Sequence, residues 1–335
     1  MLTLRARTLA ALLLTTSLTA CGGGGGGSGM ADPTPITPVP APSSIGDFPD
    51  PFILPVAGTF YAYATNGQGK NVQALRSTDR VRWTVLADAM PNLASWARPN
   101  AGLVWAPEVI RLGNRYLLYY TARDNASDRQ CVGVAVSSAP EGPFLDSRST
   151  PLVCQAAEGG TIDASPFLDG TRLYLYFKND GNCCGQPTRL YGQELAADGL
   201  SLIGTPTRLL TNQRPWEGPV IEAPTMIARA GRYELYYSGN HYLSADYAVG
   251  YATCTAPLGP CVATTDSPFL RSRTNPTLIG PGHAAIFQVG TQSWIAYHAW
   301  EELAGGRRGA RRFLYIDTLG WVDGRPVVGG PTMVP

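Results

Sequence analysis

The chain has 335 residues, of which 44% are hydrophobic and 15% are charged. This composition supports a large core and excludes disorder along the whole length. The formal net charge of +1 provides no field that would attract nucleic acid or an anionic membrane surface, so we expect neither as a partner. The 38 glycines and 28 prolines favour short strands joined by turns and exclude an all-helical fold.

Residues 1–21 have the pattern of an export signal. A basic tip with Arg5 and Arg7 precedes an apolar run that is too short to span a bilayer permanently, and the segment ends in Leu-Thr-Ala-Cys at Cys21. This ending resembles the lipobox of bacterial lipoproteins, in which the cysteine is lipidated; the alternative is an ordinary cleaved signal. Residues 22–45, rich in glycine and proline, predict a disordered tether. We therefore expect an exported protein, lipid-anchored in the bacterial cell envelope or extracellular.

Six further cysteines predict disulfides, because an even number in an exported chain is typical of them. They are Cys131, Cys154, Cys183, Cys184, Cys254 and Cys261. The last two bracket a Pro/Gly turn and the first two bracket a hairpin-sized segment, so we expect these two pairs. Cys183 and Cys184, which are adjacent, bond to each other or pair elsewhere. No spacing of Cys or His residues suits a structural zinc ion.

A glycine turn followed by an aromatic strand recurs five times along the chain. The turns lie at Gly58, Gly113, Gly170, Gly231 and Gly290. A shorter apolar strand precedes each aromatic strand, as at residues 108–110, and a third strand follows, as at residues 132–136. Repeated antiparallel sheets without helices between them bury both faces only by stacking radially. The pattern predicts an all-β, five-bladed β-propeller over residues 46–335. A β-sandwich would not explain why the glycine turns recur at nearly equal intervals.

The first strand of each propeller blade lines the central channel. Seven to nine residues before the five glycines stand Asp50, Trp105, Asp163, Glu222 and His283. Each alone has a purely structural explanation, such as a turn or a strand end, but recurrence at equivalent offsets favours one shared site. Asp47 and Glu217 stand 11 and 14 residues before their glycines and do not fit this register.

Two carboxyl groups facing across a cleft are the minimum apparatus for hydrolysing a glycosidic bond. One donates a proton to the leaving oxygen, and the other activates water or attacks the anomeric carbon. A third carboxylate close to the acid disfavours ionisation of that acid. The chain lacks Gly-x-Ser-x-Gly, phosphate-loop and His-Glu-x-x-His motifs, which leaves little support for other hydrolytic chemistry.

From about residue 46 onward the chain resembles glycoside hydrolase family 43, the inverting five-bladed propeller enzymes. The motifs that carry the resemblance lie at residues 47–51, 105–109, 162–163, 221–224 with the strand after Gly231, and 280–283 with 297–298. The resemblance implies Asp50 as general base, Glu222 as general acid, and Asp163 as the group that tunes and orients the acid. It also implies that Trp105 lines the sugar pocket. His283 would face the channel near a calcium or sodium ion bound largely through water, with no cofactor required for the chemistry.

Family members cleave α-L-arabinofuranosides, arabinan, β-xylosides or galactans. The Ala-Pro after Glu222 resembles the arabinan-active branches, so we expect an α-L-arabinofuranosidase or arabinanase that acts on oligo- or polysaccharides as a monomer. The alternatives are a β-xylosidase, a galactan-active enzyme or a non-catalytic glycan-binding lipoprotein; a retaining fructan-cleaving propeller fits the motifs poorly. Segments 65–71, 179–188 and 240–246 should form much of the pocket rim. We interpret the arginine cluster at residues 307–312 as a solvated turn rather than a sugar-binding group.

Overall fold

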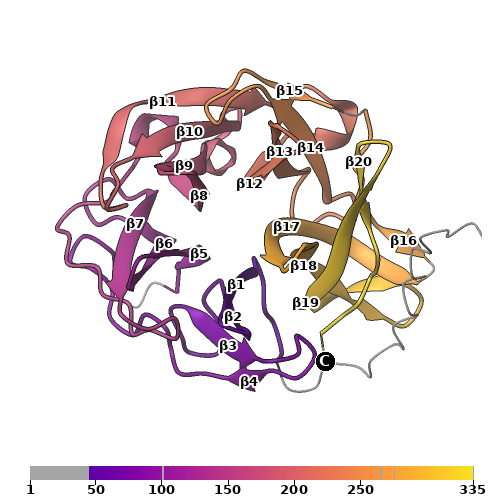
Figure 1. Ribbon diagram of the computed structural model, residues 1–335, viewed down its shortest axis with the longest axis horizontal. Coiled ribbons are helices and arrows are strands. Elements are labelled where there is room, and N and C mark those ends of the chain that lie inside the picture. Colours follow the sequence, from indigo (N-terminus) through magenta and orange to yellow (C-terminus); the bar gives the residue numbers. More distant parts are fainter. Residues whose placement is uncertain (1–44, 100–101, 265, 275, 335) are drawn as a thin grey trace, which may run out of the picture. The chain divides into compact units, whose positions relative to one another are not determined.

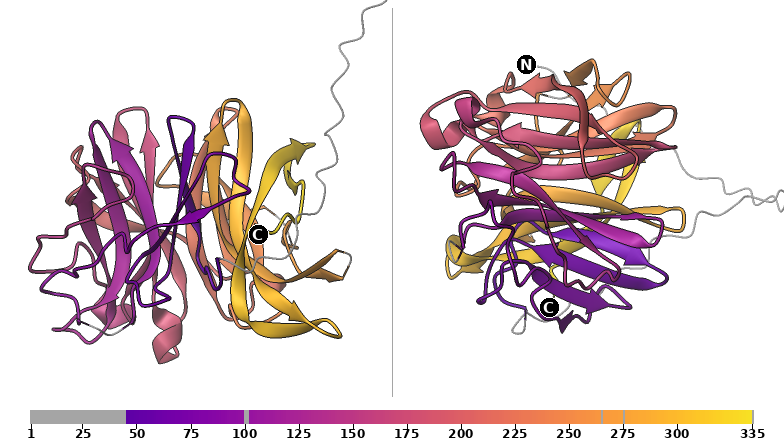
Figure 2. Two further views of the ribbon diagram at one scale, coloured as in Figure 1. Left: turned by 90° about the horizontal axis from the view of Figure 1, so that it is seen from below. Right: turned by 90° about the vertical axis from the view of Figure 1, so that its left-hand side faces the viewer.

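The computed structural model describes residues 45–334 except 100–101, 265 and 275. Five antiparallel sheets are arranged around a central axis, which confirms the predicted five-bladed β-propeller (Figure 1). Seen edge-on, the strands run roughly along this axis (Figure 2). The predicted signal, Cys21 and all of the predicted tether except Ile45 lie outside the described residues. Ile45 itself is buried against the propeller.

The blades contain three to five strands each. Blade 1 comprises β1 (Phe52–Val56), β2 (Thr59–Ala64), β3 (Gln73–Ser77) and β4 (Thr84–Val85). Blade 2 comprises β5 (Trp105–Leu112), β6 (Arg115–Arg123) and β7 (Gln130–Ser137). Blade 3 comprises β8 (Thr161–Asp169), β9 (Arg172–Asn179), β10 (Arg189–Leu195) and β11 (Leu202–Thr211).

Blade 4 comprises β12 (Ile221–Arg229), β13 (Arg232–Gly239), β14 (Ala248–Cys254) and β15 (Cys261–Ala263). Blade 5 comprises β16 (Arg273–Thr274), β17 (Thr277–Val289), β18 (Gln292–Leu303), β19 (Arg307–Val322) and β20 (Arg325–Val328). The helical segments are the short 3-10 turns η1 (Ala156–Glu158), η2 (Gly181–Cys184) and η3 (Pro215–Glu217). Within the described residues, no helix is long and apolar enough to cross a membrane.

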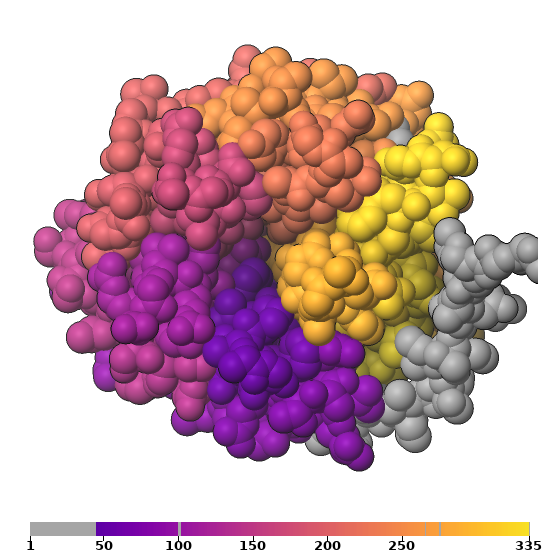
Figure 3. Space-filling model, in the orientation of Figure 1, coloured from indigo at the N-terminus to yellow at the C-terminus, as the bar shows by residue number. Residues whose placement is uncertain are grey.

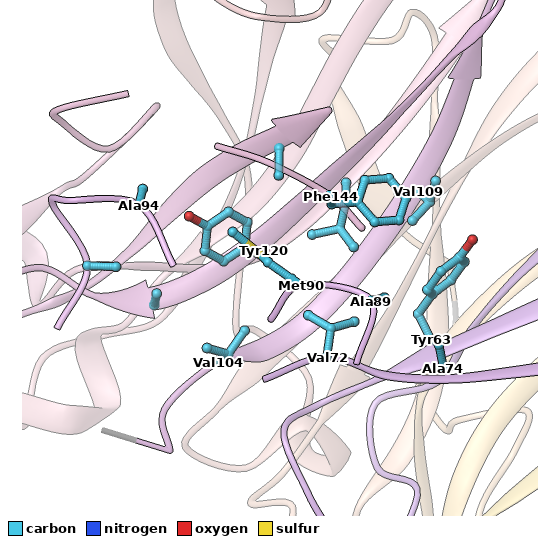
Figure 4. Close-up of a cluster of buried hydrophobic side chains, with 14 of the residues drawn as sticks. Tyr63, Val72, Ala74, Ala89, Met90, Ala94, Val104, Val109, Tyr120 and Phe144 are labelled. Atoms are coloured by element: carbon cyan, nitrogen blue, oxygen red, sulfur yellow. The ribbon is translucent and has the colours of Figure 1, made fainter. Parts of the chain in front are cut away.

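Each pair of neighbouring blades encloses its own hydrophobic cluster, because the central strands are apolar on both faces. In β6, Leu118 and Tyr120 pack toward blade 1, whereas Leu117 and Tyr119 pack toward blade 3. This alternation is the period of two expected of a strand. Figure 4 shows the cluster between blades 1 and 2. Seen along the axis, the packed side chains leave only a narrow recess at the centre of this face (Figure 3).

The ring closes between blades 1 and 5 through both ends of the propeller. The backbone N–H of Phe48 donates to the carbonyl of Arg312 (2.8 Å), and the N–H of Val334 donates to the carbonyl of Leu314 (2.9 Å). Ile45, Phe48 and Val334 share one buried cluster with residues of β18 and β19. This closure places the segment that carries Asp50 beside β19.

The inner strands share a backbone irregularity at the same depth. Their ladders shift register in β5, β8, β12 and β17. One non-glycine residue in each blade has φ between 46° and 58° at this depth, namely Asp50, Ala106, Asp163, Ala223 and His283. Such values are uncommon outside glycine, and bulges of this kind re-aim side chains beside functional sites. The repeated irregularity marks a plane across the axis where a site can assemble.

Candidate active site

A cavity of about 330 Å³ is lined by residues from all five blades. Its walls include Asp50, Trp105, Asp163, Glu222 and His283. The three segments predicted to form the rim each contribute a lining residue, namely Thr65, Asn182 and Tyr242. The structure therefore brings together residues that lie far apart along the chain.

The five predicted residues do not all occupy the same position relative to the residue with positive φ in their blade. In blades 2 and 4 the residues with positive φ are Ala106 and Ala223. Trp105 and Glu222 therefore stand one residue before the position that Asp50 occupies in blade 1. In blade 3 both the residue with positive φ and its predecessor, Asp163 and Ile162, line the cavity, whereas in blades 2 and 4 only the predecessor lines it.

Asp50 lies beside a hydroxyl group, a guanidinium group and two imidazole rings. Its Oδ2 accepts a hydrogen bond from the Thr65 hydroxyl (2.5 Å), and its Oδ1 lies 3.2 Å from Arg312 Nη1. The Nδ1 atoms of His283 and His298 each lie 3.4 Å from the same Oδ1. Burial raises the pKa of Asp50, but the Arg312 guanidinium, with smaller contributions from the histidines and Thr65, outweighs burial and holds that pKa well below its usual value. The side chain is thus a carboxylate near neutral pH, the form that a general base requires.

Both carboxylate oxygens of Glu222 are held by side chains. The Tyr247 hydroxyl donates to Oε1 (2.8 Å), and Lys178 Nζ donates to Oε2 (3.0 Å). Lys178 is wholly buried and also donates to Asn182 Oδ1 (2.7 Å). Burial lowers the pKa of Lys178, but Glu222 and the nearby aspartates outweigh burial and raise that pKa. Lys178 therefore remains an ammonium ion inside the protein.

The contact between Tyr247 and Glu222 explains a glycine of the Gly-Pro-Gly-His motif. The Tyr247 ring stacks on His298, with ring centroids 5.8 Å apart, and lies directly over Gly282. A Cβ atom at residue 282 would lie 1.9 Å from the Tyr247 ring, so no other residue fits without displacing it. The motif thus fixes the group that positions Glu222.

Asp163 is buried and lines the same cavity as Asp50 and Glu222. Its Oδ2 accepts a hydrogen bond from the backbone N–H of Ala223 (3.0 Å), the residue after Glu222. Burial, together with repulsion from Glu222, raises the pKa of Asp163 to about 6, although His283 and Lys178 oppose this shift. Asp180, which also lines the cavity, has a pKa raised to about 6, chiefly by burial.

A second buried acid, Glu108, lies close to Asp163. It belongs to the Trp-Ala-Pro-Glu motif and is 7% exposed. Burial raises the pKa of Glu108 to about 8, and the negative charge of Asp163 acts in the same direction, whereas a hydrogen bond with Ser165 opposes it. Glu108 is therefore a neutral carboxylic acid at pH 7.

Aromatic side chains border the cavity on two sides. Trp105 lines it from blade 2, and Tyr242 lines it from the segment after β13. Tyr242 stacks on Trp300, with ring centroids 6.4 Å apart, and the Arg312 guanidinium lies 5.2 Å from the centre of the Tyr242 ring. Flat apolar faces beside carboxylates suit the apolar face and the hydroxyl groups of a sugar ring.

Comparison with known proteins agrees with this geometry. The family model for glycosyl hydrolases family 43 matches residues 39–326. The chain belongs to glycosyl hydrolase family 43. It is therefore a glycosidase.

The family 43 chain is similar to several characterised proteins over most of its length. It is 25% identical over 305 residues to the extracellular endo-α-(1→5)-L-arabinanase 1 of Bacillus subtilis, covering 83% of this chain and 86% of the relative. The crystal structure of a thermostable family-43 glycoside hydrolase has a TM-score of 0.77 and 29% identity, covering 89% of this chain and 98% of the other. The structure of an endo-1,4-β-xylanase from Bacteroides thetaiotaomicron has a TM-score of 0.74 and 28% identity, covering 86% and 96%.

The sequence reasoning missed a second register in this family 43 chain, on the second strand of each blade. Seven or eight residues after the five glycines stand Thr65, Thr121, Lys178, Ser238 and His298. Three of them bond the inner strand of the next blade: Thr65 accepts from the N–H of Ala106, Ser238 from that of His283, and His298 from that of Asp50. Lys178 instead bonds Glu222. Counting forward from the same glycines, as well as backward, would have found them.

The interpretation of the arginine cluster was wrong. Residues 307–312 are not a turn but the start of β19, because β18 and β19 extend their pairing to Leu303 and Arg307. Arg307 and Arg308 are exposed, whereas Arg312 lies on the cavity wall beside Asp50.

Asp47 and Glu217, which the register excluded, serve structural purposes outside the cavity. Asp47 Oδ1 accepts a hydrogen bond from the backbone N–H of Arg312 (2.5 Å) and so joins blades 1 and 5. Glu217 is buried, and its two oxygens accept from the Tyr237 hydroxyl (2.5 Å) and from the backbone N–H of Arg214 (2.8 Å). Neither carboxylate lines the cavity.

The six described cysteines form three disulfides. The two predicted pairs, Cys131–Cys154 and Cys254–Cys261, are present. The adjacent cysteines, whose partners the sequence left open, bond to each other as Cys183–Cys184. Of the six, only Cys183 lines the cavity, within the part of the chain that the structure describes.

The side chains around His283 do not form a direct metal-binding set. Calcium prefers six to eight oxygen ligands. Among the described residues, the one cluster of metal-ligating side chains is Asp124 with Cys131 and Cys154, and these cysteines are already joined as a disulfide. We therefore derive no catalytic step through an ion. A calcium or sodium ion held through water near His283 stays a prediction.

Proposed function

We propose that this family 43 glycosidase is an inverting α-L-arabinofuranosidase or arabinanase. The observation that carries the proposal is that Asp50 and Glu222 line one cavity with opposite surroundings. Asp50 lies beside a guanidinium, whereas Glu222 lies beside Asp163 and Asp180 with one buried lysine. This asymmetry suits a base that stays ionised and an acid that can hold a proton.

Asp50 acts as the general base in the proposed mechanism. It accepts a proton from the water molecule that attacks the anomeric carbon, on the face of the sugar opposite the leaving group. Thr65 and Arg312 hold its two oxygens, so the carboxylate is oriented before substrate binds. Removing the proton from water makes the attacking oxygen a stronger nucleophile.

Glu222 acts as the general acid and gives its proton to the leaving glycosidic oxygen. Lys178 holds Oε2, and the Tyr247 hydroxyl contacts Oε1. A phenol can donate or accept a hydrogen bond. The contact with Tyr247 therefore persists whether Glu222 is protonated or ionised, which keeps the acid in place through the reaction.

Asp163 tunes and orients the acid. Above about pH 6 it carries a negative charge, and the charge of Glu222 helps to raise its pKa, so the two carboxyl groups interact. Its hydrogen bond with the N–H of Ala223 also fixes the backbone that carries Glu222.

Arabinose-containing substrates are supported by the family 43 relatives that cover most of this chain, which include an endo-α-(1→5)-L-arabinanase. Xylosides remain the second candidate, because a solved structure 28% identical to this chain is an endo-1,4-β-xylanase. The aromatic walls at Trp105 and Tyr242 accommodate either sugar.

A panel of substrates tests the proposal. Purified protein is incubated with nitrophenyl α-L-arabinofuranoside, nitrophenyl β-D-xyloside, linear arabinan and galactan. We expect the highest kcat/KM on an arabinose substrate, and proton NMR should show an inverted anomeric configuration in the first product. Turnover of the xyloside or galactan alone would replace the substrate assignment, and a retained configuration would refute the inverting mechanism.

We also propose that the protein is exported and anchored by a lipid on Cys21. The Leu-Thr-Ala-Cys ending and the glycine tract support this, and the Bacillus subtilis relative is named extracellular. Cys21→Ser should move an active enzyme from the membrane fraction to the soluble fraction. A wild-type protein that is soluble and carries no lipid would contradict the anchor.

A further inference from the structure

The Cys183–Cys184 disulfide lies in the turn that borders the acid side of the cavity. The turn η2 spans Gly181–Cys184 and ends at Gly185, which has a left-handed backbone (φ 68°). Residues 182–187 are exposed, so little packing holds the turn. A disulfide between neighbours closes a small ring that includes their peptide bond, and this ring restricts the backbone of both residues.

A chain of hydrogen bonds connects this turn to the general acid. Asn182 Oδ1 accepts from Lys178 Nζ (2.7 Å), and the same Nζ donates to Glu222 Oε2 (3.0 Å). Lys178 is wholly buried, whereas Asn182 lies on the exposed turn. One of the two side chains that hold the buried ammonium group therefore lies on this exposed turn.

The disulfide is also held from the neighbouring blade. Arg129, which precedes β7 in blade 2, directs Nη1 to Cys184 Sγ at 3.0 Å and lies 3.9 Å from Cys183 Sγ. The backbone N–H of Asp180 donates to the carbonyl of Gly160 (3.0 Å), which fixes the start of the turn. The turn is thus fixed at its beginning by the backbone, and at its end by the sulfur atoms together with the bonds from Gln186 N–H to the carbonyl of Gly181 (2.9 Å) and from Asn179 Nδ2 to the carbonyl of Pro187 (3.0 Å).

We propose that the Cys183–Cys184 disulfide is a positioning element for the general acid. It holds η2 so that Asn182 keeps Lys178 against Glu222. The inference rests on the proposed roles of Glu222 and Asp50. It assigns to this disulfide a purpose that the other two, which lie away from the cavity lining, do not share.

Kinetics on two leaving groups test the proposal. The Cys183→Ala/Cys184→Ala double variant is compared with Cys254→Ala/Cys261→Ala, which removes a disulfide on the outer strands β14 and β15. Proton donation matters most for a poor leaving group. We expect the first variant to lose about 10-fold in kcat on an alkyl arabinofuranoside and less than about 2-fold on the nitrophenyl substrate, with KM little changed. The control variant should keep the wild-type kcat on both substrates.

Asn182→Ala supplies a second route if the double cysteine variant folds poorly. It keeps the disulfide but removes the acceptor for Lys178, so we expect the same dependence on the leaving group. A variant that combines Asn182→Ala with the two cysteine substitutions should lose no more kcat than either variant alone, because both act through Lys178. Equal losses on both substrates with a raised KM would overturn the proposal in favour of a wall that contacts sugar. Unchanged kinetics in both variants would also overturn it.

A crystal structure of the double cysteine variant provides a readout without substrate. We expect Asn182 to leave Lys178 and the contact between Lys178 and Glu222 to lengthen. An unchanged contact would overturn the proposal even if the enzyme proved to act on another sugar. Wild-type protein that is inactive on every arabinoside would instead contradict the proposed function. The contact between Lys178 and Glu222 in the variant structure would then still test the role of the disulfide.

Discussion

The two halves of the cavity differ in their balance of charge. The base half contains one carboxylate, Asp50, in contact with Thr65 and the Arg312 guanidinium. The acid half contains three carboxylates, Asp163, Asp180 and Glu222, and one lysine. The same residue type therefore has opposite pKa behaviour on the two sides, because the pKa of Asp50 is lowered whereas that of Asp163 is raised to about 6.

In both halves the basic side chain that contacts the acid comes from a neighbouring blade. Arg312 comes from β19 in blade 5 and acts on a residue of blade 1. Lys178 comes from β9 in blade 3 and acts on a residue of blade 4. Changing these neighbours should therefore shift the pH dependence of activity, whereas changing the acids themselves should abolish or strongly reduce activity.

The largest expected effect follows from Asp50→Asn. Without a carboxylate, water is not activated for any substrate, so kcat/KM should fall by at least about 10³-fold on both nitrophenyl arabinofuranoside and linear arabinan. The amide keeps the shape of the side chain but loses the ion pair with Arg312, so the thermal unfolding midpoint should fall, and activity is compared at a temperature at which both proteins are folded. Activity near the wild-type level on any substrate would remove Asp50 from the base half.

Glu222→Gln should produce a loss that depends on the leaving group. Nitrophenolate can leave without being protonated, whereas a sugar hydroxyl group needs a proton to leave. We therefore expect kcat to decrease by about 10²–10⁴-fold on arabinan and much less on the nitrophenyl substrate. The comparison uses kcat at saturating substrate for both. Equal impairment on the two substrates would show that Glu222 is not the proton donor.

The sequence predicted the ring of blades well because its signal is local and repeated. A glycine turn and an aromatic strand are written five times, and each copy forms β2, β6, β9, β13 or β18 as expected. The inward register of Asp50, Asp163 and His283 follows from the same repeat. The propeller and five of the residues that line the cavity thus follow from periodicity.

The contacts that set the charge balance could not be predicted in this way, although Lys178 itself follows its glycine turn at nearly the same offset as Thr65 and His298. Arg312 reaches Asp50 because an unusually long β19 pairs with the chain segment before β1, a contact between residues 262 positions apart. Lys178 contacts Glu222 across the boundary between blades 3 and 4. Such contacts depend on how blades dock, and no pattern within one blade records them.

Arg312→Met should move the acidic limb of the pH profile. The guanidinium holds the pKa of Asp50 low, so its removal raises that pKa, and activity should decline at a higher pH as the solution is acidified. We expect a loss of about 10-fold near pH 5 and less at pH 7. Arg308→Met is the matched control, because Arg308 covers the Trp300 ring (4.2 Å) without contacting Asp50. An acidic limb that stays in place would show that other neighbours hold Asp50 ionised.

Asp163→Asn should move the opposite, alkaline limb. The wild-type carboxylate is ionised above about pH 6 and disfavours a second negative charge on Glu222. Because the two carboxyl groups interact, we expect activity in the variant to decline at a lower pH than in the wild type, by a few tenths of a unit to about one unit. A uniform decrease without a shift would restrict Asp163 to orienting the backbone at Ala223.

The smallest effect on turnover, and a clear effect on stability, is expected for Glu108→Gln. The carboxyl group of Glu108 ionises near pH 4.5 when the chain is unfolded but near pH 8 in the buried site. Between these values unfolding releases a proton, so the free energy of unfolding falls as pH rises, by about 1.4 kcal/mol per pH unit, and levels off above about pH 8.

The amide introduced by Glu108→Gln cannot ionise, and its oxygen can still accept a hydrogen bond from Ser165, so this part of the slope should disappear in the variant. Denaturant unfolding at pH 5, 6, 7 and 8 measures the difference between the variant and the wild type, which should grow in favour of the variant as pH rises. The exposed Glu302→Gln serves as the control and should keep the wild-type slope. A parallel pH dependence in Glu108→Gln and wild type would mean that Glu108 is ionised in the folded protein.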